Sequence, residues 1–255
     1  MKRILTAAAL IPLIAYVVLA ANFWIFLGVL AAVAVLCYRE YDAIAAAYGF
    51  GAPSPLGYGA GLLVLVWEGD AWLLFVAAAL LALALAMRAG KLADALPRAS
   101  FLIAGLVYIF GCWKCALPLR EASPHWLMYG LMVSWTGDIG AYYVGRSFGR
   151  HKMAPRVSPN KSWEGAAASV VSSVVLAGFY LAWFVPGVTV AAAIALTVVA
   201  NVAGQLGDLA ESAIKRGAGV KDSGGLLPGH GGLLDRVDST LFTLPVVYVW
   251  LKLVA

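Results

Sequence analysis

Residues 204–239 read GQLGDLAESAIKRGAGVKDSGGLLPGHGGLLDRVDS, a charged and glycine-rich stretch in an otherwise apolar chain. It carries five of the 13 acidic residues: Asp208, Glu211, Asp222, Asp235 and Asp238. Basic side chains lie between them, namely Lys215, Arg216, Lys221, His230 and Arg236. Acidic groups that bind a cation, basic groups that bind phosphate and a glycine backbone free to close around both indicate a site for a metal–phosphate substrate.

The composition of the whole chain indicates a protein embedded in a membrane. Of its 255 residues, 63% are hydrophobic and only 12% are charged, whereas a soluble domain is about half apolar and about a quarter charged. A soluble fold of this length has too little interior to bury so much apolar surface. We therefore expect an all-α polytopic integral membrane protein that forms a single membrane domain over residues 1–255.

Apolar segments recur along the chain at lengths that suit membrane helices. We expect nine of them, at 4–20, 22–38, 56–67, 71–87, 100–117, 125–145, 164–184, 188–206 and 239–254. The third is short for a spanning helix, and Pro118 is expected to close the fifth. Helices 1–5 would occupy 1–123, and helices 6–9, which carry the motifs, would occupy 124–255.

The distribution of basic residues predicts the orientation of these helices. If the N-terminus is cytoplasmic, 15 of the 18 Lys and Arg residues fall on the cytoplasmic side, as membrane proteins prefer. The exceptions, outside or within segments, are Lys114, Arg120 and Lys252. We therefore expect a cytoplasmic N-terminus, an external C-terminus and two long cytoplasmic loops with catalytic motifs, at 146–163 and 207–238.

The acidic residues of the opening stretch fall at helical spacing. A helix that continues past the eighth segment would carry four polar residues on one face: Asp208, Glu211, Ser212 and Lys215. Carboxylates from the ends of the eighth and ninth helices would then bracket one hard cation such as Mg²⁺. The alternative is a solvated loop whose acids pair with nearby bases. The glycines on both sides of His230 favour the site, with His230 binding phosphate or orienting the loop.

Two further features extend the predicted site. Residues 158–165, SPNKSWEG, open the seventh helix, where backbone N–H groups, hydroxyls and Lys161 would bind an anion. The alternative there is an ordinary capped helix with a snorkelling lysine. Asp138 lies inside the sixth apolar segment, where an ionisable residue is functional by default. It would form a polar wall of the same site, or else a buried contact to Thr136 or a tyrosine.

The C-terminal stretch resembles the signature of the phosphatidate cytidylyltransferases, also called CDP-diacylglycerol synthases. The matching positions are Ser212, Lys215, Arg216, Lys221, Asp222, the PGHGG run at 228–232, Asp235, Arg236 and Asp238. Residues 135–142, 158–165 and 207–212 resemble the family in the same order. The motif resemblance therefore covers roughly residues 130 to 240.

The resemblance, to bacterial members, implies a multi-pass enzyme of the inner (plasma) membrane with its active site on the cytoplasmic face. Such an enzyme joins CTP to phosphatidate, giving CDP-diacylglycerol and pyrophosphate for phospholipid biosynthesis. The resemblance also implies Mg²⁺ dependence, a monovalent cation such as K⁺ beside the Mg²⁺, a homodimer in membrane lipid, and no nucleic-acid partner. By position, it implies three metal ligands: Asp208, Asp235 and Asp238.

Carried over residue by residue, the resemblance implies two sets of site residues. The catalytic set is Asp208, Asp235, Asp238, Lys215, Arg216, Lys221, Asp222, His230 and Arg236. The substrate-binding set is Asp138, Ser158, Asn160, Lys161, Ser212, Gly231 and Gly232.

Other classes of function stay open at this point. One is a secondary transporter of an anionic metabolite, although transporters place polar sites near the membrane midplane and the charges here gather towards one face. Another is a related membrane nucleotidyl- or phosphotransferase with a different lipid acceptor. A scaffold that binds anionic lipid would leave the acidic pairs unexplained.

Overall fold

A computed structural model describes residues 2–50, 55–226 and 231–254 of the chain. It divides the chain into two compact units, and each is built from separate stretches of sequence. The first unit comprises Met1–Phe26, Cys115–Ala213 and Arg236–Ala255, and the second comprises Leu27–Lys114 and Ile214–Asp235. The single membrane domain expected from the sequence stays a prediction.

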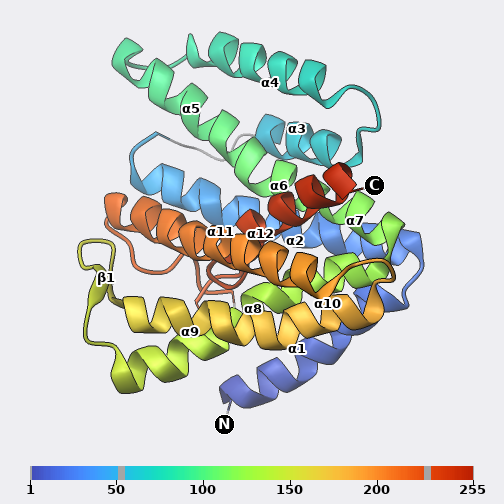
Figure 1. Cartoon of the computed structure of the whole chain (residues 1–255). Coiled ribbons are helices and arrows are strands. Elements are labelled where there is room, and N and C mark those ends of the chain that lie inside the picture. The colour runs from blue at the N-terminus through green and yellow to red at the C-terminus, as the bar shows by residue number, and fades with distance from the viewer. Residues whose placement is uncertain (1, 51–54, 227–230, 255) are drawn as a thin grey trace. The chain divides into compact units, whose positions relative to one another are not determined.

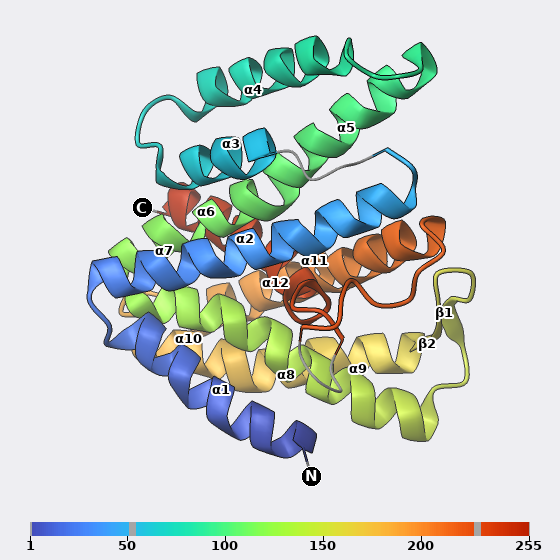
Figure 2. The same ribbon diagram turned by 180° about the vertical axis from the view of Figure 1, so that it is seen from behind.

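Helices make up most of the described chain (Figures 1 and 2). The first half contains α1 (Lys2–Leu19), α2 (Phe23–Ala47), α3 (Pro55–Val66), α4 (Ala71–Ala86), η1 (Leu92–Asp94), α5 (Ala95–Gly105), the π-helical η2 (Leu106–Gly111), α6 (Cys112–Lys114) and α7 (Ala116–Ala122). The second half contains α8 (Pro124–Phe148), β1 (Lys152–Ala154), β2 (Ser158–Ser162), α9 (Trp163–Ser173), the π-helical η3 (Val174–Gly178), α10 (Phe179–Phe184), α11 (Val190–Gly217) and α12 (Leu234–Val254).

Each predicted apolar segment coincides with a helix or with a run of helices. Among the described residues, five helical stretches are long and apolar enough to cross a membrane: Phe23–Ala47, Leu92–Ala122, Trp163–Phe184, Val190–Gly217 and Leu234–Val254. Shorter apolar helices cover Leu10–Leu19, Pro55–Val66 and Trp72–Ala86. These lengths confirm a helical, multi-pass membrane protein. The count of nine spans and their orientation stay predictions.

One expectation about the helices was wrong, and one small element was missed. Pro118 does not close a helix but lies in the first turn of α7, where a backbone N–H has no intrahelical partner to lose. The all-α class is consistent with the structure, which adds one small element: β1 and β2 pair as an antiparallel hairpin within the predicted loop 146–163. The hairpin escaped prediction because its strands are only three and five residues long.

In the first unit, α8 packs closely along α9, as both views show (Figures 1 and 2). Glycines on α8 allow this approach. A Cβ atom added to Gly140 would lie 2.2 Å from Ser172 Oγ and 2.8 Å from the Ala168 carbonyl oxygen. A Cβ atom on Gly137 would lie 2.5 Å from Asn201 Nδ2. The glycines on either side of Asp138 therefore serve helix packing.

Lys114 and Arg120, two exceptions to the predicted charge distribution, cap the carboxyl ends of helices. In the second unit, Lys114 Nζ donates to the carbonyl oxygens of Val64 (3.0 Å) and Trp67 at the end of α3. In the first unit, Arg120 Nε donates to the Val18 carbonyl oxygen (2.9 Å) near the end of α1. Carbonyls at a helix C-terminus lack intrahelical donors and carry partial negative charge. These bases therefore stabilise helix ends.

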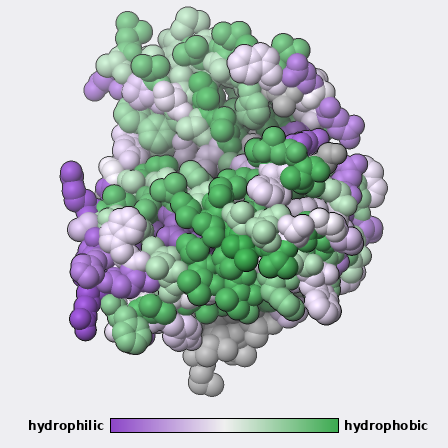
Figure 3. All heavy atoms as spheres, viewed as in Figure 1, coloured by the Kyte–Doolittle hydropathy of each residue, from purple (hydrophilic) through white to green (hydrophobic). Residues whose placement is uncertain are grey.

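Apolar side chains cover the outward surface of α9, η3 and α10. Val171, Val175, Phe179 and Trp183 are all exposed there. Figure 3 shows hydrophobic residues over this region and hydrophilic residues gathered at the edge where β1 lies. A continuous apolar surface of this kind suits contact with lipid acyl chains.

The close approach of α8 and α9 predicts a stability difference between two glycine variants. Gly140→Ala should destabilise the protein by about 1–3 kcal/mol, because the added methyl group meets a backbone oxygen. The control is Gly28→Ala in α2, since no described atom lies within 4 Å of its added Cβ. Thermal unfolding in detergent should show a lower Tm for Gly140→Ala alone. An unchanged Tm for Gly140→Ala would contradict the packing described.

Candidate active site

A cavity of about 700 Å³ opens within the first unit. Its walls come from α8, the β hairpin, α9, α11 and the start of α12. The polar residues that line it are Ser134, Asp138, Tyr142, Arg146, Lys152, Asn160, Lys161, Ser162, Ser169, Asn201, Gln205, Asp208, Ser239 and Thr243. A polar cavity between apolar helices is the environment expected of a binding site in a membrane protein.

Four of the predicted site residues line this cavity: Asp138 from α8, Asn160 and Lys161 from β2, and Asp208 from α11. Lys161 Nζ lies 2.5 Å from Asp208 Oδ2. On the other oxygen of that carboxylate, Asp208 Oδ1 accepts a hydrogen bond from Ser212 Oγ at 3.4 Å. The structure thus brings together three motifs that are separate in the sequence.

The end of β2 directs Lys161 into the cavity. The Ser162 hydroxyl accepts a hydrogen bond from the Gly165 N–H (3.2 Å) and so caps α9. The alternative of an ordinary helix cap is therefore correct for Ser162. The alternative of a snorkelling lysine is not correct for Lys161, because its ammonium group forms an ion pair with Asp208. Ser158 begins β2 and does not appear among the lining residues.

Four carboxylates of the first unit form an acid cluster: Asp138, Asp208, Glu211 and Asp238. The negative charges of the other three all act on Asp238. Glu211 is 1% exposed and Asp238 is 7% exposed, whereas Asp138 opens to the cavity. Like charges repel more strongly where water is excluded. The cluster therefore favours a bound cation, and the Lys161 ammonium group partly fills that role at Asp208.

The acid cluster fits the way proteins usually hold Mg²⁺. Carboxylate oxygens are hard ligands, and Mg²⁺ is typically bound through one or two of them together with water and substrate phosphates. Within the described ranges, no group of three or more His, Cys, Asp or Glu side chains is arranged to hold a metal ion by itself. A site completed by substrate phosphates needs no such preformed cage.

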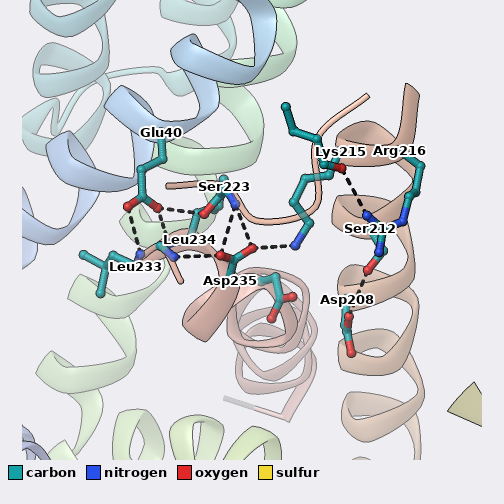
Figure 4. Close-up of polar contacts among 12 residues, drawn as sticks. Glu40, Asp208, Ser212, Lys215, Arg216, Ser223, Leu233, Leu234 and Asp235 are labelled. Carbon is teal, nitrogen blue, oxygen red and sulfur yellow. Dashed lines mark hydrogen bonds and ion pairs between the residues drawn. The ribbon is translucent and has the colours of Figure 1, made fainter. Parts of the chain in front are cut away.

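Asp235 lies in the second unit, where its carboxylate is fully engaged with protein groups (Figure 4). Lys215 Nζ lies 2.5 Å from Asp235 Oδ1, and both side chains are buried. Asp235 Oδ2 accepts hydrogen bonds from the backbone N–H groups of Ser223 (3.0 Å) and Gly232 (2.7 Å). Gly231 has a φ of 80°, and a Cβ atom there would lie 2.7 Å from Asp235 Oδ2. The role of Asp235 as a metal ligand stays a prediction.

The remaining signature residues are bonded elsewhere or exposed. Arg216 Nη1 donates to the Val220 carbonyl oxygen (3.1 Å) at the end of α11. That helix ends in a Schellman turn, in which Gly219 adopts a φ of 74° and the Val220 N–H donates to the Lys215 carbonyl oxygen. Three further members of the predicted set are exposed: Lys221, Asp222 and Arg236. His230 lies outside the described residues.

Sequence reasoning missed several residues that line the cavity. Asn201 and Gln205 are polar residues in the apolar part of α11, joined by a hydrogen bond from Gln205 Nε2 to Asn201 Oδ1 (2.7 Å). The rule that a polar residue inside an apolar segment is a candidate functional residue, which identified Asp138, would also have found Asn201 and Gln205. Arg146 and Lys152 also line the cavity. In the sequence they counted only among the basic residues that predict the orientation in the membrane. Arg146 donates to the Tyr142 hydroxyl (2.9 Å), one helical turn away.

The cavity predicts a contrast in thiol reactivity. Ala166 lines the cavity, whereas Val175 is exposed on the apolar outward surface of η3. In a variant without the three native cysteines, Ala166→Cys in membranes should react about tenfold or more faster than Val175→Cys with a charged thiosulfonate, because only a hydrated thiol ionises readily. Equal rates would contradict a water-filled cavity.

Comparison with known proteins identifies the family. Residues 1–254 match the model of a family described as "Cytidylyltransferase family". The chain is 41% identical over 156 residues to a phosphatidate cytidylyltransferase of Bacillus subtilis (strain 168), which covers 60% of this chain and 58% of the relative. It is 38% identical over 153 residues to a phosphatidate cytidylyltransferase of Staphylococcus haemolyticus (strain JCSC1435), and this match covers 60% of this chain and 59% of the relative. The matches therefore span less than two thirds of these relatives. On the match over almost its whole length, the chain belongs to the cytidylyltransferase family.

Proposed function

We propose that this protein transfers the cytidylyl group of CTP to phosphatidate, giving CDP-diacylglycerol and pyrophosphate. The relatives that carry the name phosphatidate cytidylyltransferase support this reaction. The observation that carries it is the cavity of the first unit, where Asp138, Asp208 and Lys161 meet between apolar helices.

The location of the two substrates constrains where the reaction occurs. Phosphatidate stays in the bilayer and CTP stays in water, so the site must lie at the depth of the lipid headgroups. The cavity contributes three bases to bind their phosphates: Arg146, Lys152 and Lys161. Each basic residue near an anionic membrane surface contributes about 1 kcal/mol of attraction. We place this site on the cytoplasmic face of the bacterial plasma membrane, which the distribution of basic residues supports.

The proposed chemistry is a direct displacement at phosphorus. A phosphate oxygen of phosphatidate attacks the α-phosphorus of CTP, the bond from that phosphorus to the α–β bridging oxygen breaks, and pyrophosphate leaves with the electron pair. The second pKa of a phosphate monoester is about 6, so the nucleophile is already mostly dianionic at neutral pH. Catalysis therefore requires positioning and charge neutralisation more than a strong general base.

We assign the parts of this reaction to residues of the cavity and of the acid cluster. Lys161 exchanges its contact with Asp208 for a substrate phosphate, and Asp208 and Asp238 would hold Mg²⁺. When bound, Mg²⁺ neutralises charge on the nucleotide phosphates. Asp235 is a third predicted ligand, and it would have to release Lys215 to take a cation. A K⁺ ion and a homodimer rest on the resemblance alone.

The reaction itself is tested with the purified protein, phosphatidate and CTP labelled at the α-phosphate. We expect label to enter the lipid phase only when Mg²⁺ is present, and EDTA should abolish the transfer because the phosphate charges are then not neutralised. Labelled lipid formed equally well in EDTA would contradict the Mg²⁺ site. A folded protein that forms no labelled lipid from phosphatidates of several chain lengths would contradict the proposed reaction.

Asp208 carries a second prediction. Asp208→Asn removes a charge from the cation site and should lower kcat by about a hundredfold or more, the scale of losing one electrostatic contact at a reacting phosphate. The matched control is Asp94→Asn, because among the described residues the Asp94 side chain makes no capping hydrogen bond. Both variants should elute as folded protein. Full activity in Asp208→Asn would remove this residue from the mechanism.

A further inference from the structure

Glu40, in the second half of α2, contacts the signature from more than 180 residues away in the sequence. Glu40 is 7% exposed, and its carboxylate accepts three hydrogen bonds (Figure 4). Glu40 Oε1 accepts from the Leu233 N–H (3.0 Å). Glu40 Oε2 accepts from the Leu234 N–H (2.8 Å) and the Ser223 hydroxyl (2.9 Å). Glu40 therefore holds both ends of the segment Ser223–Leu234.

These bonds give the carboxylate a definite structural task. α12 begins at Leu234, and the residue before it, Leu233, has no side-chain oxygen to cap the first N–H groups. Glu40 supplies that acceptor from α2, at the helix end where the backbone N–H groups carry partial positive charge. A buried carboxylate is strongly unfavourable without such partners. The contact is therefore specific to an acidic side chain.

Two glycines of the stretch make room for Glu40. A Cβ atom on Gly224 would lie 2.7 Å from Glu40 Oε1, and one on Gly232 would lie 2.4 Å from Glu40 Oε2. Further along α2, the Tyr48 hydroxyl donates to the Ile214 carbonyl oxygen (2.8 Å). A Cβ atom on Gly217 would lie 1.9 Å from that hydroxyl oxygen. Glu40 thus contacts the start of α12, and Tyr48 contacts the last turns of α11.

Glu40 and Asp235 together occupy three successive backbone N–H groups. The Gly232 N–H donates to Asp235, and the N–H groups of Leu233 and Leu234 donate to Glu40. Ser223 joins the two carboxylates, since its N–H bonds to Asp235 and its hydroxyl bonds to Glu40. A run of free amides would bind a phosphate. Here the carboxylates of Glu40 and Asp235 accept the hydrogen bonds that a phosphate would otherwise accept.

We infer that Glu40 is a positioning residue for the signature loop. It fixes Ser223 and Leu233, and thereby holds Asp235 and its partner Lys215 in the arrangement that the transfer reaction uses. It also keeps the amides of Leu233 and Leu234 from binding a substrate phosphate. This inference rests on the proposed function for its activity readout, but the contacts themselves do not depend on it.

The direct test compares Glu40→Gln with Glu40→Asp and with the control Glu121→Gln, whose side chain is exposed on α7. Glu40→Gln replaces one acceptor oxygen by a donor that faces an N–H group. A displacement of about 1 Å can lower a rate by about a hundredfold, so we expect kcat for cytidylyl transfer to fall on that scale. Glu40→Asp should recover part of the loss because the carboxylate returns, and Glu121→Gln should match the wild type.

Hydrogen exchange separates positioning from general stability and does not require activity. In Glu40→Gln, peptides that cover residues 231–236 should exchange faster, whereas peptides from α8 and α9 should exchange at the wild-type rate. Faster exchange throughout the protein, with a matching loss of folded material, would overturn the inference in favour of a purely structural role. Unchanged kcat or unchanged exchange at 231–236 would also overturn it. If the wild type itself transfers no label, the proposed function fails while the exchange result still decides the role of Glu40.

A double-mutant cycle tests the contact in a second way. Gly224→Ala should lower thermal stability in the wild type, because its methyl group meets Glu40. In the Glu40→Ala background that obstacle is gone, and the same change should have little further effect. Strictly additive shifts in Tm would show that the two residues do not interact and would contradict the contact.

Discussion

The repulsion that Asp138, Asp208 and Glu211 exert on Asp238 is the electrostatic constraint on which the proposed site depends. Asp138 and Asp208 line the cavity, whereas Glu211 and Asp238 are buried, and like charges placed close together are stabilised by a nearby cation. Lys161 supplies one, at 2.5 Å from Asp208. The β hairpin and the capped start of α9 direct that lysine to α11. The packing glycines of α8 let α9 approach closely enough for Asp138, Lys161 and Asp208 to line one cavity.

The second unit handles buried acids differently, and the contrast is informative. Glu40 and Asp235 are saturated by backbone N–H groups, a hydroxyl and Lys215. A carboxylate satisfied in this way holds the chain in place and has little tendency to bind a further cation. A carboxylate that faces other carboxylates is under electrostatic strain that a substrate-bound metal would relieve. We therefore propose positioning for Glu40 and cation binding for the acid cluster.

The sequence predicts features that depend on residues near one another in the chain. It does not predict contacts between residues that are far apart in the chain. Apolar runs and polar motifs are local patterns, so the helices and the residues Asp138, Lys161 and Asp208 could be predicted. Asn201 and Gln205 were within reach of the same rule. The hairpin, with its very short strands, carries too weak a pattern. Glu40 could not be found, because its partners lie more than 180 residues away and its importance appears only once α2 contacts the signature.

The central claim is that the acid cluster of the first unit is the divalent cation site. The most direct measurement is Mn²⁺ binding by electron paramagnetic resonance, with CTP present, comparing the wild-type protein with Asp238→Asn and with the Asp94→Asn control. We expect Mn²⁺ affinity to fall about tenfold or more in Asp238→Asn, because one carboxylate of the site is lost, and to be unchanged in the control. Equal Mn²⁺ affinity in all three proteins would contradict the account and would place the cation elsewhere.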